Sequence, residues 1–412
     1  MSRQEYSKVK LADVATLVNG RAYLMPELQD SGKYKIVRVG NFSGKDEWFY
    51  SDMELEPDKY CYKGDLLYKW ACTFGPEIWN DKKTIYHYHI WKIVNDPERI
   101  DRDYLYYLLK AMTPYWLAGT HGSTMVHITK EGMEDNDITI PVSTGYQKTV
   151  ARILRTIDDK IALSKKMMAE LEDTARLIYD YWFTQFDFPD ENGKPYRSSG
   201  GKMVYNETLK REIPEGWEAG LMSDLGSVVS GATPSTGDSS NYADEGIAWI
   251  TPNDLSDNDS FMHISHGKRD VSGVGLASCS AVMMPAGSTI MSSRAPIGYL
   301  AVAETACCTN QGCKSLVADA GYPSYFNFFT VQRLMPLIRS QGAGTTFAEV
   351  SKEDFASVRL ARPPKGMAER FEKSVLPLCE KSKRLQTETV ELSSLRDWLL
   401  PMLMNGQVSI SE

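Results

Sequence analysis

Two small groups of side chains in this sequence have the chemistry to bind a metal ion. Cys307, Cys308 and Cys313 form its only cysteine cluster, and thiolates are strong zinc ligands. His87 and His89 alternate, so both side chains would lie on one face of a strand. No Cys-x-x-Cys pair or nearby histidine pair completes the cysteine group. We therefore predict structural thiols and surface histidines, with a metal-binding histidine pair as the alternative.

Other familiar reactive motifs are missing from the sequence. It contains no Gly-x-x-x-x-Gly-Lys-Ser/Thr phosphate loop and no Gly-x-Gly-x-x-Gly dinucleotide fingerprint. It also lacks the Asn-Pro-Pro-Phe/Tyr segment that amino-methyltransferases use. No set of nucleophile, base and acid stands out. The sequence therefore predicts no catalytic residue and no metal site, and an enzyme with an unrecognised site is the least favoured interpretation.

The elements that position these side chains occur twice in the chain. Segment 11–20, LADVATLVNG, is similar to segment 222–231, MSDLGSVVSG. Segment 122–131, GSTMVHITKE, is similar to segment 344–353, GTTFAEVSKE. The offset grows only from roughly 211 to roughly 222 residues, which indicates one long tandem duplication. A duplicated module with a duplicated spacer suggests a protein that recognises two things at a fixed distance.

Each copy begins with a mixture of strands and one helix. Alternating β-branched and aromatic residues predict the strands 34–39, 65–68, 88–94 and 138–141 in the first copy and 247–250, 288–291, 314–317 and 358–361 in the second. A helix is predicted at 103–110, before Pro114, with a counterpart near 325–338. Each module is therefore predicted to be a compact α+β domain.

A long helical pattern follows each module. From about 147 to 185, apolar residues recur at steps of four and three, with charged residues elsewhere and only Ser164 polar in the stripe. A matching stripe follows the second module, and Pro377 is expected to kink its first turns. The polar residues that interrupt this second stripe are Ser382, Thr389 and Arg396.

We predict that the two long helices pair with each other, because their seams have similar lengths. The residues predicted to form the pairing seam are Ile157, Ile161, Met168, Leu171, Ile178, Leu378, Leu385, Leu392 and Leu399. A two-fold relation between the copies would make the helices antiparallel and place the C-terminal segment near the N-terminal module. The alternative is that each amphipathic helix packs on its own module.

Composition places the chain among ordinary globular proteins. Its 412 residues allow two or three domains, and 42% are hydrophobic and 24% charged. Seven cysteines without regular spacing favour reduced thiols, no apolar run reaches membrane-spanning length, and the start MSRQEY lacks a signal core, so we expect a cytoplasmic protein. The net charge of −8 counts against a free-standing nucleic-acid binder, but not against one that shares phosphate contacts with partner subunits.

A series of short motifs runs through the second half of the chain. The motifs are IPEGWE (213–218), SGATPS (230–235), AWITPNDL (248–255), SSRAPIG (292–298) and TNQGCK (309–314). Two helix endings accompany them, WFTQFDF (182–188) and LRDWLLPML (395–403). Their order and the duplication together resemble the DNA-specificity (S) subunit of type I restriction–modification systems over nearly the whole chain.

The first module departs more from the family pattern. It has no Gly-Trp opening and no Thr-Asn-Gln-Gly segment, and KWACTFG at 69–75 stands where the second module has SSRAPIG. The resemblance implies two target-recognition domains with different targets, in a non-catalytic adaptor. It also implies two modification subunits that carry adenine methyltransferase chemistry with S-adenosylmethionine, and restriction (helicase-nuclease) subunits that use Mg and ATP. No cofactor is expected in this chain.

Polar side chains that can hydrogen bond to base edges are the candidate DNA-binding residues. In the second module they are Asn253, Ser292, Ser293, Arg294, Asn310, Gln311, Lys314, Thr345 and Thr346. In the first module they are Arg38, Lys69, Trp70, Thr73, His87, Lys92, His121, Ser123 and Thr124. The glycine-rich segments at 120–124 and 341–346 suit close approach to phosphates through backbone N–H groups. A solvated loop is the alternative for each residue.

We therefore predict an α+β fold with two tandem target-recognition domains separated by a pair of long antiparallel coiled-coil-like helices with pseudo-two-fold symmetry. Double-stranded DNA is the predicted ligand, and no membrane is involved. The predicted boundaries are 1–144 and 211–365 for the recognition domains, 145–187 and 366–406 for the spacer helices, and 188–210 for the linker. The alternative from another class is a duplicated coiled-coil scaffold that binds proteins and has no DNA role.

Overall fold

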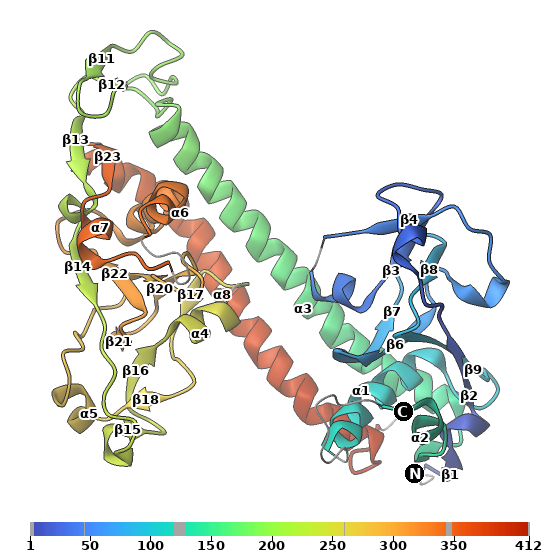
Figure 1. Cartoon of the computed structure of the whole chain (residues 1–412). Coiled ribbons are helices and arrows are strands. Elements are labelled where there is room, and N and C mark those ends of the chain that lie inside the picture. Colours follow the sequence, from blue (N-terminus) through green and yellow to red (C-terminus); the bar gives the residue numbers. More distant parts are fainter. Residues whose placement is uncertain (1–3, 45, 119–127, 259, 343–347, 411–412) are drawn as a thin grey trace. The chain divides into compact units, whose positions relative to one another are not determined.

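The chain divides into two compact units (Figure 1). The computed structural model describes residues 4–44, 46–118, 128–258, 260–342 and 348–410. Unit 1 consists of Met1–Ile161 and Glu391–Glu412, and unit 2 consists of Ala162–Val390. Two long helices, α3 (Thr144–Tyr179) and α8 (Lys365–Met404), each contribute one part to each unit.

The described residues of unit 1 contain three sheets and two further α-helices. Its strands are β1 (Tyr6–Lys10), β2 (Ala15–Asn19), β3 (Tyr34–Val37), β4 (Phe49–Ser51), β5 (Tyr60–Cys61), β6 (Leu66–Ala71), β7 (Thr73–Ile78), β8 (Thr84–Tyr86), β9 (Ile90–Asn95) and β10 (Asp137–Pro141). They form the sheets β2-β9-β6-β7 and β4-β3-β8-β5 and the pair β1-β10. Helices α1 (Arg102–Ala118) and α2 (Lys130–Glu134) complete the unit.

Unit 2 repeats this plan with additions. Its strands are β11 (Met203–Asn206), β12 (Arg211–Pro214), β13 (Glu218–Leu221), β14 (Ser227–Ser230), β15 (Tyr242–Ala243), β16 (Ile247–Ile250), β17 (His263–Ile264), β18 (Asp270–Val271), β19 (Thr289–Ser292), β20 (Leu300–Ala303), β21 (Cys307–Thr309), β22 (Cys313–Val317) and β23 (Arg359–Arg362). They form the sheets β14-β22-β19-β20-β17 and β15-β18-β16-β21 and the pairs β13-β23 and β11-β12. The helices are α4 (Pro252–Asp257), α5 (Gly273–Ala277), α6 (Ser324–Ser340) and α7 (Lys352–Ala356).

The predicted duplication is confirmed by the topology. The pair β1-β10 corresponds to β13-β23, and the sheet β2-β9-β6-β7 corresponds to β14-β22-β19-β20. Each unit also contains a parallel strand pair at the same place, β3 with β8 and β16 with β21. The short helices α2 and α7 are capped alike, because the hydroxyls of Thr129 and Ser351 accept hydrogen bonds from backbone N–H groups three residues later. The sequence therefore encodes one module twice.

One helix end differs from the prediction at a proline. Helix α1 does not end before Pro114 but continues to Ala118, because Trp116 and Leu117 beyond the proline still pack against the core. The helix predicted near 325–338, which includes Pro336, is confirmed as α6, and α8 continues through Pro377, where the kink stays a prediction. A proline removes one helical hydrogen bond, and burial of apolar residues on both sides can offset that cost.

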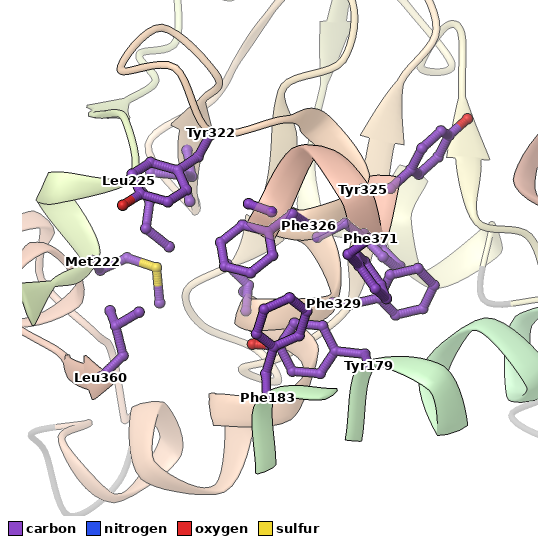
Figure 2. Packing of buried hydrophobic residues seen from close by; sticks show 14 of the residues in the cluster. Tyr179, Phe183, Met222, Leu225, Tyr322, Tyr325, Phe326, Phe329, Leu360 and Phe371 are labelled. Atoms are coloured by element: carbon purple, nitrogen blue, oxygen red, sulfur yellow. The ribbon is translucent and has the colours of Figure 1, made fainter. Parts of the chain in front are cut away.

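The core of unit 2 joins three helices through aromatic rings (Figure 2). Tyr179 and Phe183, at the end of α3 and in the π-helical turn that follows it (Asp180–Thr184), lie against Phe326 of α6 and Phe371 of α8. The ring centroids of Phe183 and Phe326 are 5.0 Å apart, and those of Phe183 and Phe371 are 5.3 Å apart. Such aromatic pairs contribute about 0.5–1.5 kcal/mol each beyond burial. The end of α3 is thereby fixed to unit 2.

The opposite ends of the two long helices are fixed in unit 1. The carboxylate of Asp158, in the first half of α3, accepts hydrogen bonds from Arg396 of α8 at 2.9 Å and from the hydroxyl of Tyr107 at 2.8 Å. Each unit thus pairs the beginning of one helix with the end of the other, so the antiparallel arrangement is confirmed. Tyr6 also lies against Gly406, which places the two terminal segments on the same unit.

The predicted pairing seam contains buried apolar residues and also the polar residues that the stripes predicted. Ile161, Met168 and Leu385 are buried, whereas the other predicted seam residues are only partly buried: Ile157, Leu171, Ile178, Leu378, Leu392 and Leu399. The polar residues Ser164, Ser382 and Thr389 are buried as well. The hydroxyl of Thr389 donates to the carbonyl of Leu385 at 2.7 Å, which satisfies a buried polar group within the helix. The residue-by-residue seam assignment stays a prediction.

Candidate nucleic-acid interface

Two loops of unit 2 lie side by side because their strands are paired. The loop that follows β19 carries Arg294, and the turn between β21 and β22 carries Asn310 and Gln311. Strands β19 and β22 are antiparallel neighbours, with Ser292 opposite Cys313. The N–H of Ser293 donates to the carbonyl of Gly312 at 2.8 Å and continues the pairing beyond the strand ends. Two segments that are separate in the sequence thus form one surface.

Ser292 determines the shape of the β19–β20 loop. Its hydroxyl donates to the carbonyl of Pro296 at 2.8 Å and accepts from the N–H groups of Gly298 at 3.1 Å and Tyr299 at 2.9 Å. The residue is fully buried. These bonds tie the two ends of the loop together, so Ser292 positions its neighbours. For Ser292 itself to contact a base, its hydroxyl would have to break these hydrogen bonds.

A turn with the same unusual backbone occurs in both units. Ala295 has φ of 55°, and Cys72, which follows β6 in unit 1, has φ of 66°. Three residues after each of them stands a left-handed glycine, Gly298 with φ of 112° and Gly75 with φ of 124°. A left-handed non-glycine residue costs about 1–2 kcal/mol. The duplication has kept this strained turn while the side chains around it differ, and strain of this kind is often found at binding sites.

Two of the candidate residues in unit 2 are held by partners inside the protein. The ammonium of Lys314 donates to Ser293 Oγ at 3.2 Å and to the carbonyl of Gln311 at 3.1 Å. Lys314 and Ser293 are both buried. Glu349 accepts from Lys314 at 3.4 Å and forms an ion pair with Arg294 at 3.7 Å. Glu349 therefore balances two positive charges at the edge of the surface.

Arg294, Asn310, Gln311 and Asn253 are the accessible members of the group. Arg294 and Asn310 converge around Gly312, where an added Cβ would lie 3.2 Å from Asn310 Oδ1, 3.3 Å from Arg294 Nε and 2.8 Å from Cγ of the proline that precedes Asn253. Gln311 directly precedes this glycine in the chain. Arginine and amide side chains are the donors and acceptors that read guanine and adenine in the major groove. The structure therefore brings together the right chemistry on one exposed surface.

The candidate residues of unit 1 do not form one comparable group. Lys69 and Trp70 are neighbours on β6, so their side chains lie on opposite faces of the sheet. Lys69 is buried and forms an ion pair with Glu77 at 2.7 Å. On the same module, the ammonium of Lys92 donates to the backbone carbonyl of Tyr60 at 2.8 Å. Both lysines therefore have structural partners.

Trp70 belongs instead to an aromatic cluster that includes both histidines. Its ring centroid lies 5.1 Å from that of His89, and its indole N–H donates to the carbonyl of Tyr88 at 2.9 Å. The His87 and His89 rings are 4.9 Å apart. Burial, together with the nearby His89 and Arg38, lowers the pKa of His87 to about 4, so its imidazole is neutral at neutral pH. Flat aromatic faces of this kind can stack on bases or contact thymine methyl groups.

The remaining candidates differ in exposure. Thr73 is exposed at the strained turn of unit 1, next to Cys72. Arg38 is half-buried, lies over the ring of Phe49 at 4.3 Å, and forms an ion pair with Glu47 at 3.4 Å. The five remaining predicted residues lie outside the described residues: His121, Ser123, Thr124, Thr345 and Thr346.

The cysteines that suggested metal binding lie buried in the protein. The described parts of the chain contain no cluster of three or more histidine, cysteine or acidic residues that could hold a metal ion. Cys307, Cys308 and Cys313 are buried free thiols. Burial raises the pKa of Cys307 to about 12 and that of Cys308 to about 11, which favours inert thiols.

Sequence reasoning missed several residues that shape these surfaces. Glu349 follows a glycine-rich segment and shows no motif, and only the fold places it against Arg294 and Lys314. Thr233, whose hydroxyl donates to Gln311, comes from a distant motif. The sequence could have indicated Tyr88 as part of the aromatic cluster, because it lies between His87 and His89.

Comparison with known proteins identifies the class. The family described as the type I restriction modification DNA specificity domain matches residues 3–173 and 214–370. The chain therefore belongs to this family. The two matched ranges correspond to the two copies of the duplicated module, the first together with most of α3 and the second with only the start of α8.

Individual relatives agree with this assignment. The type I restriction enzyme MjaIX specificity subunit of Methanocaldococcus jannaschii is 32% identical over 161 residues, which cover 39% of this chain and 37% of that protein. The HindI specificity subunit of Haemophilus influenzae is 24% identical over 343 residues, covering 71% of this chain and 73% of that protein. This chain thus matches little more than a third of the first relative's length.

The fold is also similar to that of a solved S subunit. The crystal structure of the type I restriction–modification S subunit from M. genitalium covers 98% of this chain and 97% of its own, with a TM-score of 0.60 and 15% identity. This similarity supports the fold alone. No helix within the described ranges is long and apolar enough to cross a membrane.

Proposed function

We propose that this chain reads a bipartite target in double-stranded DNA, one half with the module of each unit. The observation that carries the proposal is the strained turn that both modules share. Around the same backbone, unit 2 presents Arg294 beside Asn310 and Gln311, whereas unit 1 presents Thr73 and an aromatic cluster. A constant scaffold with different base-reading side chains suits two different half-sites.

In this proposal the chain is a non-catalytic adaptor in the cytoplasm. Adenine methylation belongs to two modification subunits that bind S-adenosylmethionine, and cleavage belongs to restriction subunits that use Mg²⁺ and ATP. The relatives named as specificity subunits of type I restriction enzymes support this division of labour. The duplication supports the number of modification subunits, because each repeat offers a related surface to one copy.

The test is to express the chain with the modification subunit in a host that has no other adenine methyltransferase, and to map methylated adenines by genome sequencing. We expect methylation at one bipartite motif with an unread gap, and no methylation when this chain is omitted. Methylation that does not depend on the chain would contradict the proposal. A complex that forms without changing the methylation pattern would instead favour the protein-binding scaffold.

A further inference from the structure

Unit 2 contains a cavity of about 360 Å³ at the end of α3. It lies between α6, β23 and the segment that joins β11 to β12, and its apolar side is formed by Phe183, Leu334 and Leu360. Figure 2 shows Phe183 beside Tyr179 on this side of the aromatic core. The cavity therefore borders the aromatic core of unit 2.

Three arginines line the same cavity, and two of them have no carboxylate partner. Arg333 forms an ion pair with Asp180 at 2.8 Å. Within the described parts of the chain, Arg211 and Arg359 form no ion pair, although Arg211 lies 5.4 Å from the centre of the Phe186 ring. Burial and the charge of Arg333 lower the pKa of Arg211, as expected where positive charge lacks an anion. In a chain with net charge −8, this concentration of cations is distinctive.

Unit 1 has a cavity at the equivalent place. Its volume is about 210 Å³, and it lies between α1, β10 and the end of α8, which correspond to α6, β23 and the end of α3. Met112, Ile138 and Met404 take the places of Leu334, Leu360 and Phe183. The duplication has therefore kept an apolar opening in both repeats.

The two cavities differ in charge. In unit 1, Ala111 stands in the place of Arg333, and Asp137 in the place of Arg359. Asp137 is neutralised by Lys8 at 2.7 Å. The segment that contributes Leu209 and Arg211 lines only the cavity of unit 2. Positive charge is thus a property of one cavity, whereas the apolar floor is common to both.

We propose that the cavity of unit 2 is a docking site for a segment of the modification subunit in which an aspartate or glutamate adjoins an apolar side chain. The apolar side chain fills the floor, and the carboxylate bonds to Arg211 and Arg359, because guanidinium groups bind carboxylates in a bidentate way. A DNA phosphate would meet the arginines but would gain nothing from a recessed apolar floor. This inference rests on the proposed function and names a partner surface for it.

The first test compares two double variants. Arg211→Gln with Arg359→Gln removes the two unpaired charges, and Lys352→Gln with Lys373→Gln removes two exposed cations of the same unit away from the cavity. Affinity for the purified modification subunit is measured over a range of salt concentrations, after thermal melting shows that each variant folds. We expect at least tenfold weaker binding and a shallower salt dependence for the arginine variant alone.

The outcomes separate the two proposals. Equal affinity of the arginine variant, the lysine control and the unmodified chain overturns the docking site but leaves the proposed function intact. At saturating modification subunit, the arginine variant should still direct methylation to the original motif. If the unmodified chain binds no modification subunit, the proposed function and the docking site both fail.

Photo-crosslinking identifies the occupant directly. Leu337 lines the cavity and is 42% exposed, so Leu337→p-benzoylphenylalanine places a reactive group inside it. In the complex with modification subunit and duplex DNA, we expect a crosslink to a modification-subunit peptide that contains an acidic residue. Val274→p-benzoylphenylalanine, exposed on α5 outside the cavity, is the control and should not label that peptide. Crosslinking to DNA alone would show that the cavity binds phosphate, and would overturn the proposal.

Discussion

At the scale of residues, burial separates side chains that shape the candidate DNA surface from those that can meet a ligand. Ser292, Arg294 and Gln311 all have base-reading chemistry, but Ser292 is fully buried while Gln311 is exposed. Ser292 binds three backbone groups of its own loop. The accessible residues are therefore the ones expected to determine specificity.

Replacing an accessible residue should change only one half of the target. We expect Arg294→Ala or Gln311→Ala to relax the half-site read by unit 2, at a cost of about 1–3 kcal/mol if the lost contact is bidentate. Sequencing of methylated adenines in cells that carry each variant gives the motif. A change in the half-site read by unit 1 would refute the assignment.

Replacing the buried hydroxyl should affect stability instead. Ser292→Ala removes the side-chain acceptor of the N–H of Tyr299, whereas the N–H of Gly298 keeps the backbone carbonyl of residue 292 at 3.0 Å. We expect the substitution to lower the free energy of unfolding by about 1–3 kcal/mol. Ser315→Ala is the matched control, because its buried hydroxyl has no hydrogen-bond partner among the described residues. Urea unfolding measures both. Equal effects of the two substitutions would show that the loop does not depend on Ser292.

A buried histidine makes stability sensitive to acid. Burial, together with the charge of Lys383, lowers the pKa of His263 from 6.5 to about 4. Between these two pH values, His263 binds a proton in the unfolded chain but not in the folded chain. The free energy of unfolding therefore falls as pH falls from about 6.5 to about 4, by roughly 3 kcal/mol in total.

The variant His263→Gln tests this sign. Urea unfolding between pH 4.5 and 7.5 should show a weaker loss of stability at low pH than in the unmodified chain. Part of the acid sensitivity should remain, since the pKa of His87 is lowered in the same direction. Identical pH dependence in both proteins would exclude His263 as a source.

At the scale of elements, the two ends of the long helices are related but not identical. In unit 1, Asp158 binds Arg396 and Tyr107. At the equivalent places of unit 2 the residues are Cys379, Ala175 and Phe329, all buried in an apolar core. All three residues differ between the repeats. In unit 1 a charged carboxylate joins the two helices, and in unit 2 apolar packing joins them.

The helices are expected to set the distance between the half-sites. Four residues inserted after Ile161 in α3 and four after Val390 in α8 would lengthen each helix by about 6 Å. At 3.4 Å per base pair, this corresponds to about two base pairs. We expect the methylated motif to keep both half-sites and to widen its unread gap by one or two base pairs. An unchanged gap in an active variant would show that the helices do not set the spacing.

At the scale of the whole molecule, net charge limits what the chain can do alone. Much of the affinity of DNA-binding proteins comes from neutralising phosphates, and this chain carries a net charge of −8. Ion pairs also occupy some of the candidate cations, such as Lys69 with Glu77 and Arg294 with Glu349. Partner subunits are therefore expected to supply most phosphate contacts.

The net charge predicts that the isolated chain and its complex differ in how tightly they bind DNA. At physiological salt, the purified chain should bind duplex DNA weakly and with little sequence preference, whereas the complex with modification subunits should bind tightly and specifically. Gel-shift titrations of the same duplex with both preparations make the comparison. Tight, specific binding by the chain alone would contradict the prediction.

The sequence by itself determined the duplication, the order of elements and the family. These depend on local periodicity and short motifs, which is why the strands around Leu66 and Ile93 and the two long helices were predicted correctly. The end of helix α1 was predicted less well, because packing beyond Pro114 outweighed a local signal.

Only the tertiary structure decided which polar residues face outward and which hold the fold. Burial and ion pairing depend on residues far apart in the sequence: Ser292 and Lys314 are buried, and Glu349 stands beside Arg294. The stripe pattern already placed Ser164 in the seam between the long helices, but only the structure shows that its side chain is buried. The paired cavities are visible only in three dimensions, since separate parts of the chain form them, four segments in unit 2 and three in unit 1.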